Sequence, residues 1–349
     1  MNTTRASTIL ILLVVGLIAI FLLSLSLGSV SIPVEQIVTI LFGGSAEKAS
    51  WATIVLKFRL PKAITAALAG AALAVSGLQM QTLFRNPLAG PFVLGISSGA
   101  SLGVALVVLA AGVAGGNSLL AGVSLTGDVS LAVASIAGST LVLLLVMAVA
   151  RRVQSTMTLL ILGLMFGYAT SALVSILLYF SLAERIQAYI SWTFGNFSGV
   201  TWSQLWVFGP VVVAGLIGSH LLVKPLNALL LGDTYARSMG LNVRLARLGV
   251  IGASASLAGV VTAFCGPIGF LGIAVPHLCR SLFNTSDHRL LLPAVTLMGG
   301  ILALAADLLA QLPGSQLTLP LNAVTALLGA PVVTWVILRQ RNLRESFAG

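Results

Sequence analysis

The stretch LQMQTLFRNPLAGPFVLGISSGASLG, residues 78–103, interrupts a strongly apolar chain with polar residues, two prolines and spaced glycines. A proline removes a backbone donor and blocks a continuous helix, so the preceding helix must end near Arg85. Non-helical backbone at membrane depth is tolerated only where it is buried in protein or lines a cavity. The stretch therefore predicts two membrane helices joined by a turn at a mouth of the protein.

The composition of the whole chain indicates a membrane protein. Of its 349 residues 58% are hydrophobic and only 7% are charged, and the mean hydropathy is +1.08. A soluble domain of this size needs far more polar residues, so lipid must be the solvent for much of the surface. Ten apolar runs of about the length of a membrane span predict an all-α, polytopic fold with about ten transmembrane helices. These runs lie at 9–28, 63–83, 92–113, 129–150, 157–180, 205–223, 248–264, 268–284, 290–312 and 321–338.

Some of these assignments leave alternatives. The runs 248–264 and 268–284 meet at FCGPIG, so one broken segment would give the same pattern. The first run follows Arg5 as the core of a signal peptide would, but it is longer than the usual core, so a retained helix is expected. Segments 33–43 and 183–202 mix polar and apolar residues and are expected to form short helices that do not span the membrane.

The basic residues orient the chain in the membrane. With the N-terminus in the cytoplasm, thirteen of the 18 Lys and Arg residues fall on the cytoplasmic side, in agreement with the positive-inside rule. The other five lie outside: Lys48, Lys57, Arg59, Lys62 and Arg185. The net charge of +10 therefore reflects topology, not nucleic-acid binding, and both termini are expected in the cytoplasm.

The sequence lacks the motifs of several enzyme classes. It has no GxxxxGK[ST] phosphate loop, so this chain should not hydrolyse ATP itself. His220, His277 and His288 are far apart in the sequence, and Cys265 and Cys279 lie inside apolar runs. These positions predict neither a metal site nor a bound cofactor.

Asp307 is the one acidic residue deep inside a predicted span. Its burial costs roughly 2.5–3.5 kcal/mol on insertion scales, so the carboxylate needs a partner. Gln311, four residues further on, shares its helix face and can supply a hydrogen bond. A structural role for Asp307 is favoured over a transport role, and a metal-containing solute would carry its own chelator.

Glycines recur at four-residue spacing after the proline-broken turn. Gly95, Gly99 and Gly103 are expected to form a smooth stripe on one helix face, with Ser98 adding a small polar group beside it. Such a stripe lets another helix approach closely. Tight helix packing is one interpretation, and a contribution to a transport pathway is the other.

The segment LNALLLGDTYARSMGLNV, residues 226–243, predicts a short helix on the cytoplasmic side. Asp233 can cap its N-terminus, and Gly240 can end it in the left-handed conformation. The enclosed Thr234–Met239 is under two turns long and too short to be stable alone in water. It is therefore expected to pack against a partner, with a capped surface loop as the alternative.

Several motifs, in order along the chain, resemble the signatures of the FecCD-type permeases. They are RLPK (59–62), GAALAVSGLQMQTLFRNPLAGPFVLGISSGASLG (70–103), LNALLLGDTYARSMGL (226–241), GPIGFLGIAVPHLCR (266–280), DHRLLLPAVTLMGG (287–300) and VTALLGAP (324–331). The sequence departs from the family pattern near the outer face, at Gln311, Thr318 and Asn322. These departures bear on solute entry and binding-protein docking, and they do not touch the motifs on the inner side.

The resemblance implies a permease subunit of a binding-protein-dependent ATP-driven importer in the bacterial inner membrane. Residues 1–349 would form one transmembrane domain, with a cytoplasmic coupling loop at 223–247. The implied partners are two ATP-binding subunits that hold ATP and magnesium, a periplasmic or lipid-anchored solute-binding protein, and a second permease copy. The implied solute is a metal chelate: a ferric siderophore first, then haem or cobalamin.

The resemblance also assigns roles to individual residues. Asn86 and Leu88 would form the cytoplasmic gate, and Arg59 and Lys62 would meet acidic residues of the binding protein, unless they only anchor the chain at the membrane interface. The residues expected to couple the permease to the ATPase are Gly232, Asp233, Ala236, Arg237, Gly240 and Leu241. A secondary transporter driven by an ion gradient is the alternative function, although Asp307 alone offers little for binding a coupling ion.

Overall fold

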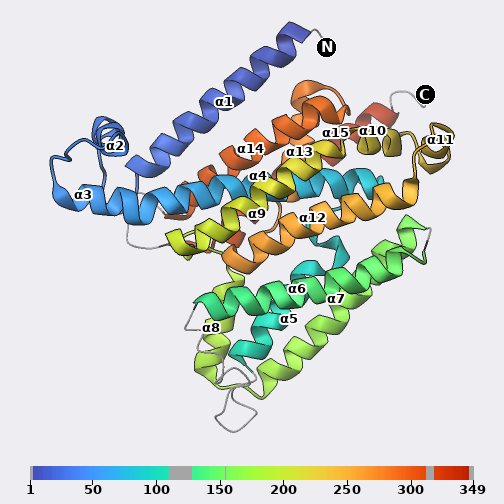
Figure 1. Ribbon diagram of the computed structural model, residues 1–349, viewed down its shortest axis with the longest axis horizontal. Helices are drawn as coiled ribbons and strands as arrows, with labels where there is room; N and C mark the ends of the chain where they lie inside the picture. The colour runs from blue at the N-terminus through green and yellow to red at the C-terminus, as the bar shows by residue number, and fades with distance from the viewer. Residues whose placement is uncertain (1–2, 110–127, 154, 312–317, 346–349) are drawn as a thin grey trace.

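The computed structural model describes residues 3–109, 128–153, 155–311 and 318–345, and within these ranges it contains helices and no strand (Figure 1). Helices are expected because a chain in lipid must satisfy its backbone hydrogen bonds within each segment. The long helices are α1 (Thr3–Ser26), α4 (Leu60–Phe84), α6 (Asp128–Ala150), α7 (Thr156–Tyr179), α9 (Trp202–Leu221), α12 (Val243–Cys265), α14 (His288–Gln311) and α15 (Leu321–Glu345). The shorter ones are α2 (Val34–Leu41), α3 (Ala49–Thr53), α5 (Ile96–Val108), α8 (Ala183–Thr193), α10 (Val223–Leu230), α11 (Asp233–Ser238) and α13 (Leu271–Phe283). A π-helical turn at Ile54–Arg59 leads into α4, and a 3-10 turn at Pro91–Leu94 precedes α5.

Within the described ranges, ten apolar helices correspond to the ten predicted spans. Seven are long and apolar enough to cross a membrane, and α5, α13 and the apolar part of α15 are shorter. The uncertain pair at FCGPIG is two helices, because α12 ends at Cys265 and α13 begins at Leu271. The two short non-spanning helices are present as α2 and α8. The predicted residues 110–113 and 312 lie outside the described ranges.

Helix α4 is the centre of the molecule. It is buried along most of its length and lies between α14 and α12 in Figure 1, with α9 and α13 also packed against it. Its glycines set the packing distance: a Cβ on Gly70 would overlap the Gly299 carbonyl of α14, and one on Gly77 would overlap the Gly272 carbonyl of α13. Backbones that approach so closely gain dispersion contacts, which drive helix association in lipid.

Helices α5, α6 and α7 form a second group beside this core (Figure 1). Gly99 and Gly103 of α5 pack directly on α6, where a Cβ would overlap the carbonyls of Gly138 and Ala134. The predicted three-glycine stripe is wrong at Gly95. That residue precedes α5 with a φ of 74° and ends the 3-10 turn, because a left-handed residue is needed there to redirect the chain.

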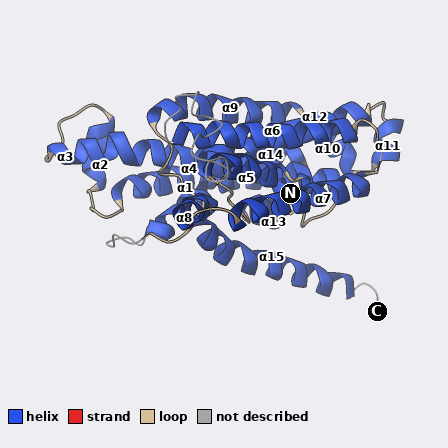
Figure 2. Ribbon diagram, turned by 90° about the horizontal axis from the view of Figure 1, so that it is seen from below, coloured by secondary structure: helices blue, strands red, loops and turns tan. Residues whose placement is uncertain are grey.

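The two ends of α4 lie in different surroundings (Figure 1). Its N-terminal end lies near α2 and α3, and its C-terminal end lies near α10, while α11 follows α10 at the same end of the molecule. Helix α15 runs away from the rest of the bundle in Figure 2 and carries exposed apolar side chains such as Leu327 and Trp335.

Candidate functional site

The turn at Arg85–Ala89, called the gate turn here for the role that the resemblance implies, is a compact and defined structure. Arg85 ends α4 in the left-handed conformation, with a φ of 44°. The side-chain oxygen of Asn86 then accepts a hydrogen bond from the Leu88 amide at 2.9 Å, and its carbonyl accepts one from the Ala89 amide at 3.1 Å. This arrangement leaves the Leu88 side chain 46% exposed within the single chain.

Helix α13 makes hydrogen bonds to the gate turn and to the end of α4. The ring Nε2 of His277 lies 2.8 Å from the Pro87 carbonyl, so this nitrogen must carry the proton and donate. Gln81, one turn before the gate turn, donates to the Ile273 carbonyl at 3.3 Å and accepts a hydrogen bond from Arg280. Hydrogen bonds of α4 and α13 therefore fix the conformation of the turn where the prolines interrupt the helix.

Helices α10 and α11, called here the coupling element, lie at the same end of the molecule. Ala236 of α11 is fully buried in a small cluster with Leu229 and Val243, and Gly240 leaves the helix with a φ of 80°. The prediction for Gly240 is therefore confirmed. The prediction that Asp233 caps α11 is wrong: Gly232, with a φ of 108°, is the capping position and makes no side-chain bond.

Asp233 is instead used in ion pairs. It is the first residue of α11, and its carboxylate pairs with Arg247 of α12 and, at 3.5 Å, with Arg85 of the gate turn. The Arg85 guanidinium also lies against Gly232, where a Cβ would come within 3.2 Å of it. The coupling element and the gate turn are therefore in direct contact.

Three apolar side chains of this region face away from the protein. Leu231, which follows α10, is 63% exposed, and Tyr235 of α11 and Met239 at its C-terminal end are 56% and 60% exposed. Tyr235 and Met239 are four residues apart, so these two share one face of α11. Arg237 beside them is also exposed, whereas Leu241 is half-buried. The sequence prediction named Ala236 and missed Tyr235 and Met239, although their spacing was visible in the sequence.

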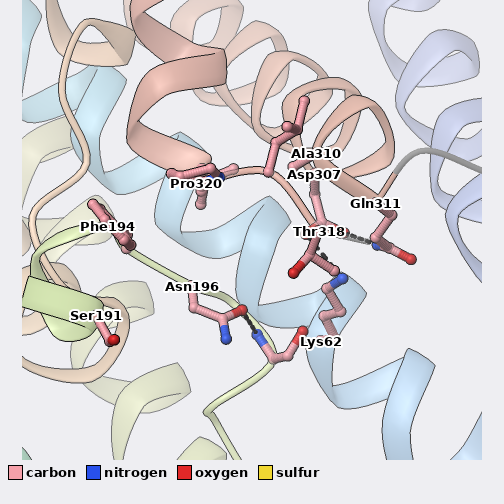
Figure 3. Close-up of a pocket in the computed structure, with 13 residues that line it drawn as sticks. Lys62, Ser191, Phe194, Asn196, Asp307, Ala310, Gln311, Thr318 and Pro320 are labelled. Carbon is pink, nitrogen blue, oxygen red and sulfur yellow. Dashed lines mark hydrogen bonds and ion pairs between the residues drawn. The ribbon is translucent and has the colours of Figure 1, made fainter. Parts of the chain in front are cut away.

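At the opposite end of α4, a buried ion pair joins two helices. The ammonium group of Lys62 lies 3.0 Å from one carboxylate oxygen of Asp307, and Gln311 donates to the other oxygen at 2.7 Å (Figure 3). The predicted Gln311 partner is confirmed, and Lys62 is the partner that the sequence did not indicate. Thr318 and Asn196 line the same pocket, which has a volume of about 290 Å³.

Arg59 also has partners inside the chain. Its guanidinium donates to the carbonyls of Leu25 and Ser26 at 2.7 and 2.9 Å and to that of Val30, at the end of α1. A cation there satisfies the last carbonyls and complements the helix dipole. Both basic residues that the resemblance assigns to docking are thus engaged within the chain, and their docking role stays a prediction.

The remaining sequence candidates lie within helix packing. Ser98 of α5 faces α7, where a Cβ on Gly167 would lie 3.5 Å from its hydroxyl oxygen. Close packing accounts for Gly99 and Gly103, and a part in a transport pathway stays a prediction for these residues. Among the described residues, no group of three or more His, Cys, Asp or Glu side chains could hold a metal ion.

Comparison with known proteins gives consistent matches. The family model described as the FecCD transport family matches residues 16–339. The vitamin B12 import system permease protein BtuC of Klebsiella pneumoniae subsp. pneumoniae is 39% identical over 286 residues, which is 82% of each chain. The BtuC protein of Salmonella paratyphi A is 40% identical over 285 residues, 82% of this chain and 83% of the relative.

A solved structure shares the fold. It is a chain of a metal-chelate type ABC transporter in an inward-facing conformation, and it superposes with a TM-score of 0.81 at 28% identity. The match covers 95% of this chain and 99% of the other. The all-helical architecture and its connectivity are therefore those of an ABC importer permease.

Proposed function

Because the chain belongs to the FecCD transport family, we propose that it is the permease subunit of an ATP-driven importer that moves a metal chelate into the cytoplasm. The observation that carries the proposal is the meeting of a proline-broken turn with the coupling element through the Arg85–Asp233 pair. A partner that pushes on the coupling element has a direct route to the turn.

Two solute classes are supported equally. The relatives with 39–40% identity are vitamin B12 permeases, which favours cobalamin. The structural neighbour is a metal-chelate type transporter, which favours the wider class that includes ferric siderophores. Haem, a third chelate, ranks behind these two. In each case the metal arrives inside its own chelator, so the permease needs no metal ligands.

The proposed partners follow from surfaces that a single chain leaves open. The exposed side chains of Tyr235 and Met239 on α11, with Leu231 just before it, suit a groove on an ATP-binding subunit, because burying apolar side chains contributes about 25 cal/mol per Å². One such subunit would bind each of two permease copies and supply ATP and magnesium. A solute-binding protein would dock at the outer end, near α2 and the Lys62–Asp307 pocket.

Alternating access would then be driven from the cytoplasmic side of the bacterial inner membrane. Nucleotide-driven closure of the ATP-binding subunits moves the coupling element, and the gate turn of each copy opens or closes with it. Both chain termini would lie in the cytoplasm. ATP hydrolysis belongs to the partners, since this sequence has no phosphate loop.

The test is uptake by proteoliposomes that contain the permease, its co-purified ATPase and its solute-binding protein. Radiolabelled cyanocobalamin and a radiolabelled ferric hydroxamate chelate serve as the two solutes. We expect that one of the two solutes is taken up. This uptake should require ATP and magnesium on the side of the membrane where the ATPase subunits lie. Uptake driven by a proton or sodium gradient without ATP would instead identify a secondary transporter.

A further inference from the structure

A fully buried histidine joins the coupling element to the helix that bears the gate turn. His288, the first residue of α14, lies between α10 and the C-terminal end of α4. Its Nδ1 is 2.8 Å from the side-chain oxygen of Asn227 in α10, and its Nε2 is 2.8 Å from the hydroxyl of Thr82 in α4. Thr82 stands three residues before Arg85.

The surrounding contacts fix which atoms donate. The Asn227 amide nitrogen donates to the Asp287 carboxylate at 2.7 Å, and the Asn227 oxygen accepts from the His288 backbone amide at 2.9 Å. The Asn227 oxygen must therefore face the ring, and the ring Nδ1 must carry a proton to bond it. In the neutral ring Nε2 is then the acceptor, and Thr82 gives its single hydroxyl proton to Nε2 instead of to the Leu78 carbonyl, which lies 2.9 Å away.

The result is a directed chain of hydrogen bonds, in which Thr82 of α4 donates to His288 and His288 donates to Asn227 of α10. Thr82 and His288 are buried and Asn227 is half-buried, whereas the Arg85–Asp233 pair has side chains that are 51% and 32% exposed. An exposed ion pair contributes little and is screened by salt, but a buried polar group that loses its partner keeps its full desolvation cost. The buried link is therefore the one that holds α10 and the end of α4 together as a unit.

We infer that His288 is a positioning residue of the transport cycle, which transmits displacement of the coupling element to the gate turn through Asn227 and Thr82. This inference rests on the proposed function. It adds that the two helices move together because their buried polar groups cannot separate without losing partners. A link of this kind is demonstrated by coupling between the two ends, not by its position between them.

The ring offers a matched pair of substitutions. In His288→Asn the amide nitrogen takes the place of Nδ1, so the bond to Asn227 is kept and the bond to Thr82 is lost. In His288→Gln the amide reaches the place of Nε2, so the reverse holds. Thr82→Val removes the hydroxyl at constant shape, and Thr82→Ser retains it. His220→Asn is the control, because His220 is exposed and its ring Nδ1 contacts the Leu216 carbonyl within the same helix, α9.

The readout is the labelling of Leu88→Cys by a membrane-impermeant maleimide, in liposomes that contain the permease with its ATPase subunits. The native Cys265 and Cys279 are buried and give a low background. We expect the labelling rate of the parent to change when a non-hydrolysable ATP analogue and magnesium are added. In His288→Asn, His288→Gln and Thr82→Val this change should shrink about fivefold, with equal ATPase bound per permease, and it should persist in Thr82→Ser and His220→Asn.

The possible results distinguish failure of the inference from failure of the proposed function. If the variants only lower the melting temperature or the yield and keep the full nucleotide response, His288 is a packing residue and the inference is wrong. A full response in Thr82→Val alone would also overturn it, since that variant breaks the link without changing volume. A wild-type permease that imports neither radiolabelled chelate with ATP would refute the proposed function, whereas a Leu88→Cys parent that does not respond to nucleotide would overturn the inference alone.

Discussion

At the scale of single residues, the Lys62–Asp307 pair makes the clearest prediction about stability. Lys62→Met leaves the Asp307 carboxylate buried with Gln311 alone, and breaking a buried pair costs about 3–5 kcal/mol. Adding Asp307→Leu removes the stranded charge, so the double variant should recover most of the loss. The melting temperatures of the single and double variants are measured by the reaction of the buried Cys265 and Cys279 with a thiol-reactive dye during heating. The exposed Lys57→Met is the matched control. Equal melting temperatures for Lys62→Met and Lys57→Met would show that the pair does not stabilise the fold.

At the scale of elements, α11 separates a buried side from an exposed one. Tyr235→Asp with Met239→Asp places charge on the exposed face, so we expect the permease to insert normally and to lose at least tenfold in co-purified ATPase. Ala236→Asp differs, because Ala236 is fully buried and a carboxylate there disrupts the packing of α11 on the chain itself. Thr39→Asp, on the exposed side of α2 at the opposite end, is the control. ATPase recovery equal to the control would mean that another surface binds the ATPase.

At the scale of the whole molecule, the proposed gating role of the turn at Arg85–Ala89 can be tested by solute leak. Leu88 is 46% exposed, and exposed apolar side chains also line α7 and α15, so closure is expected to involve a second copy. Leu88→Ala should raise the passive leak of cyanocobalamin from loaded vesicles about tenfold or more, because the mouth loses its apolar side chain. Asn86→Ala should act in the same direction by removing the bond that positions Leu88. Unchanged leak in the double variant Asn86→Ala, Leu88→Ala would count against a gating role.

The sequence by itself determined the spans, the break between α4 and α5 and the left-handed Gly240. Each of these depends on a local property: an apolar run of a given length, a proline that blocks a helix, or a glycine that tolerates a positive φ. The resemblance in the motifs, which are also local, was sufficient to indicate the FecCD family, and the comparison with known proteins confirmed it.

Only the tertiary structure decided which polar side chains meet. Asp233 was expected to cap α11 and instead pairs with Arg85 and Arg247. Lys62 pairs with Asp307, a contact that the sequence did not indicate, and its docking role stays a prediction. Thr82 and His288 are 206 positions apart in the chain and nevertheless share a hydrogen bond. The physical reason is that helix formation follows from neighbours in sequence, whereas the partner of a buried charge or ring is set by how the helices pack.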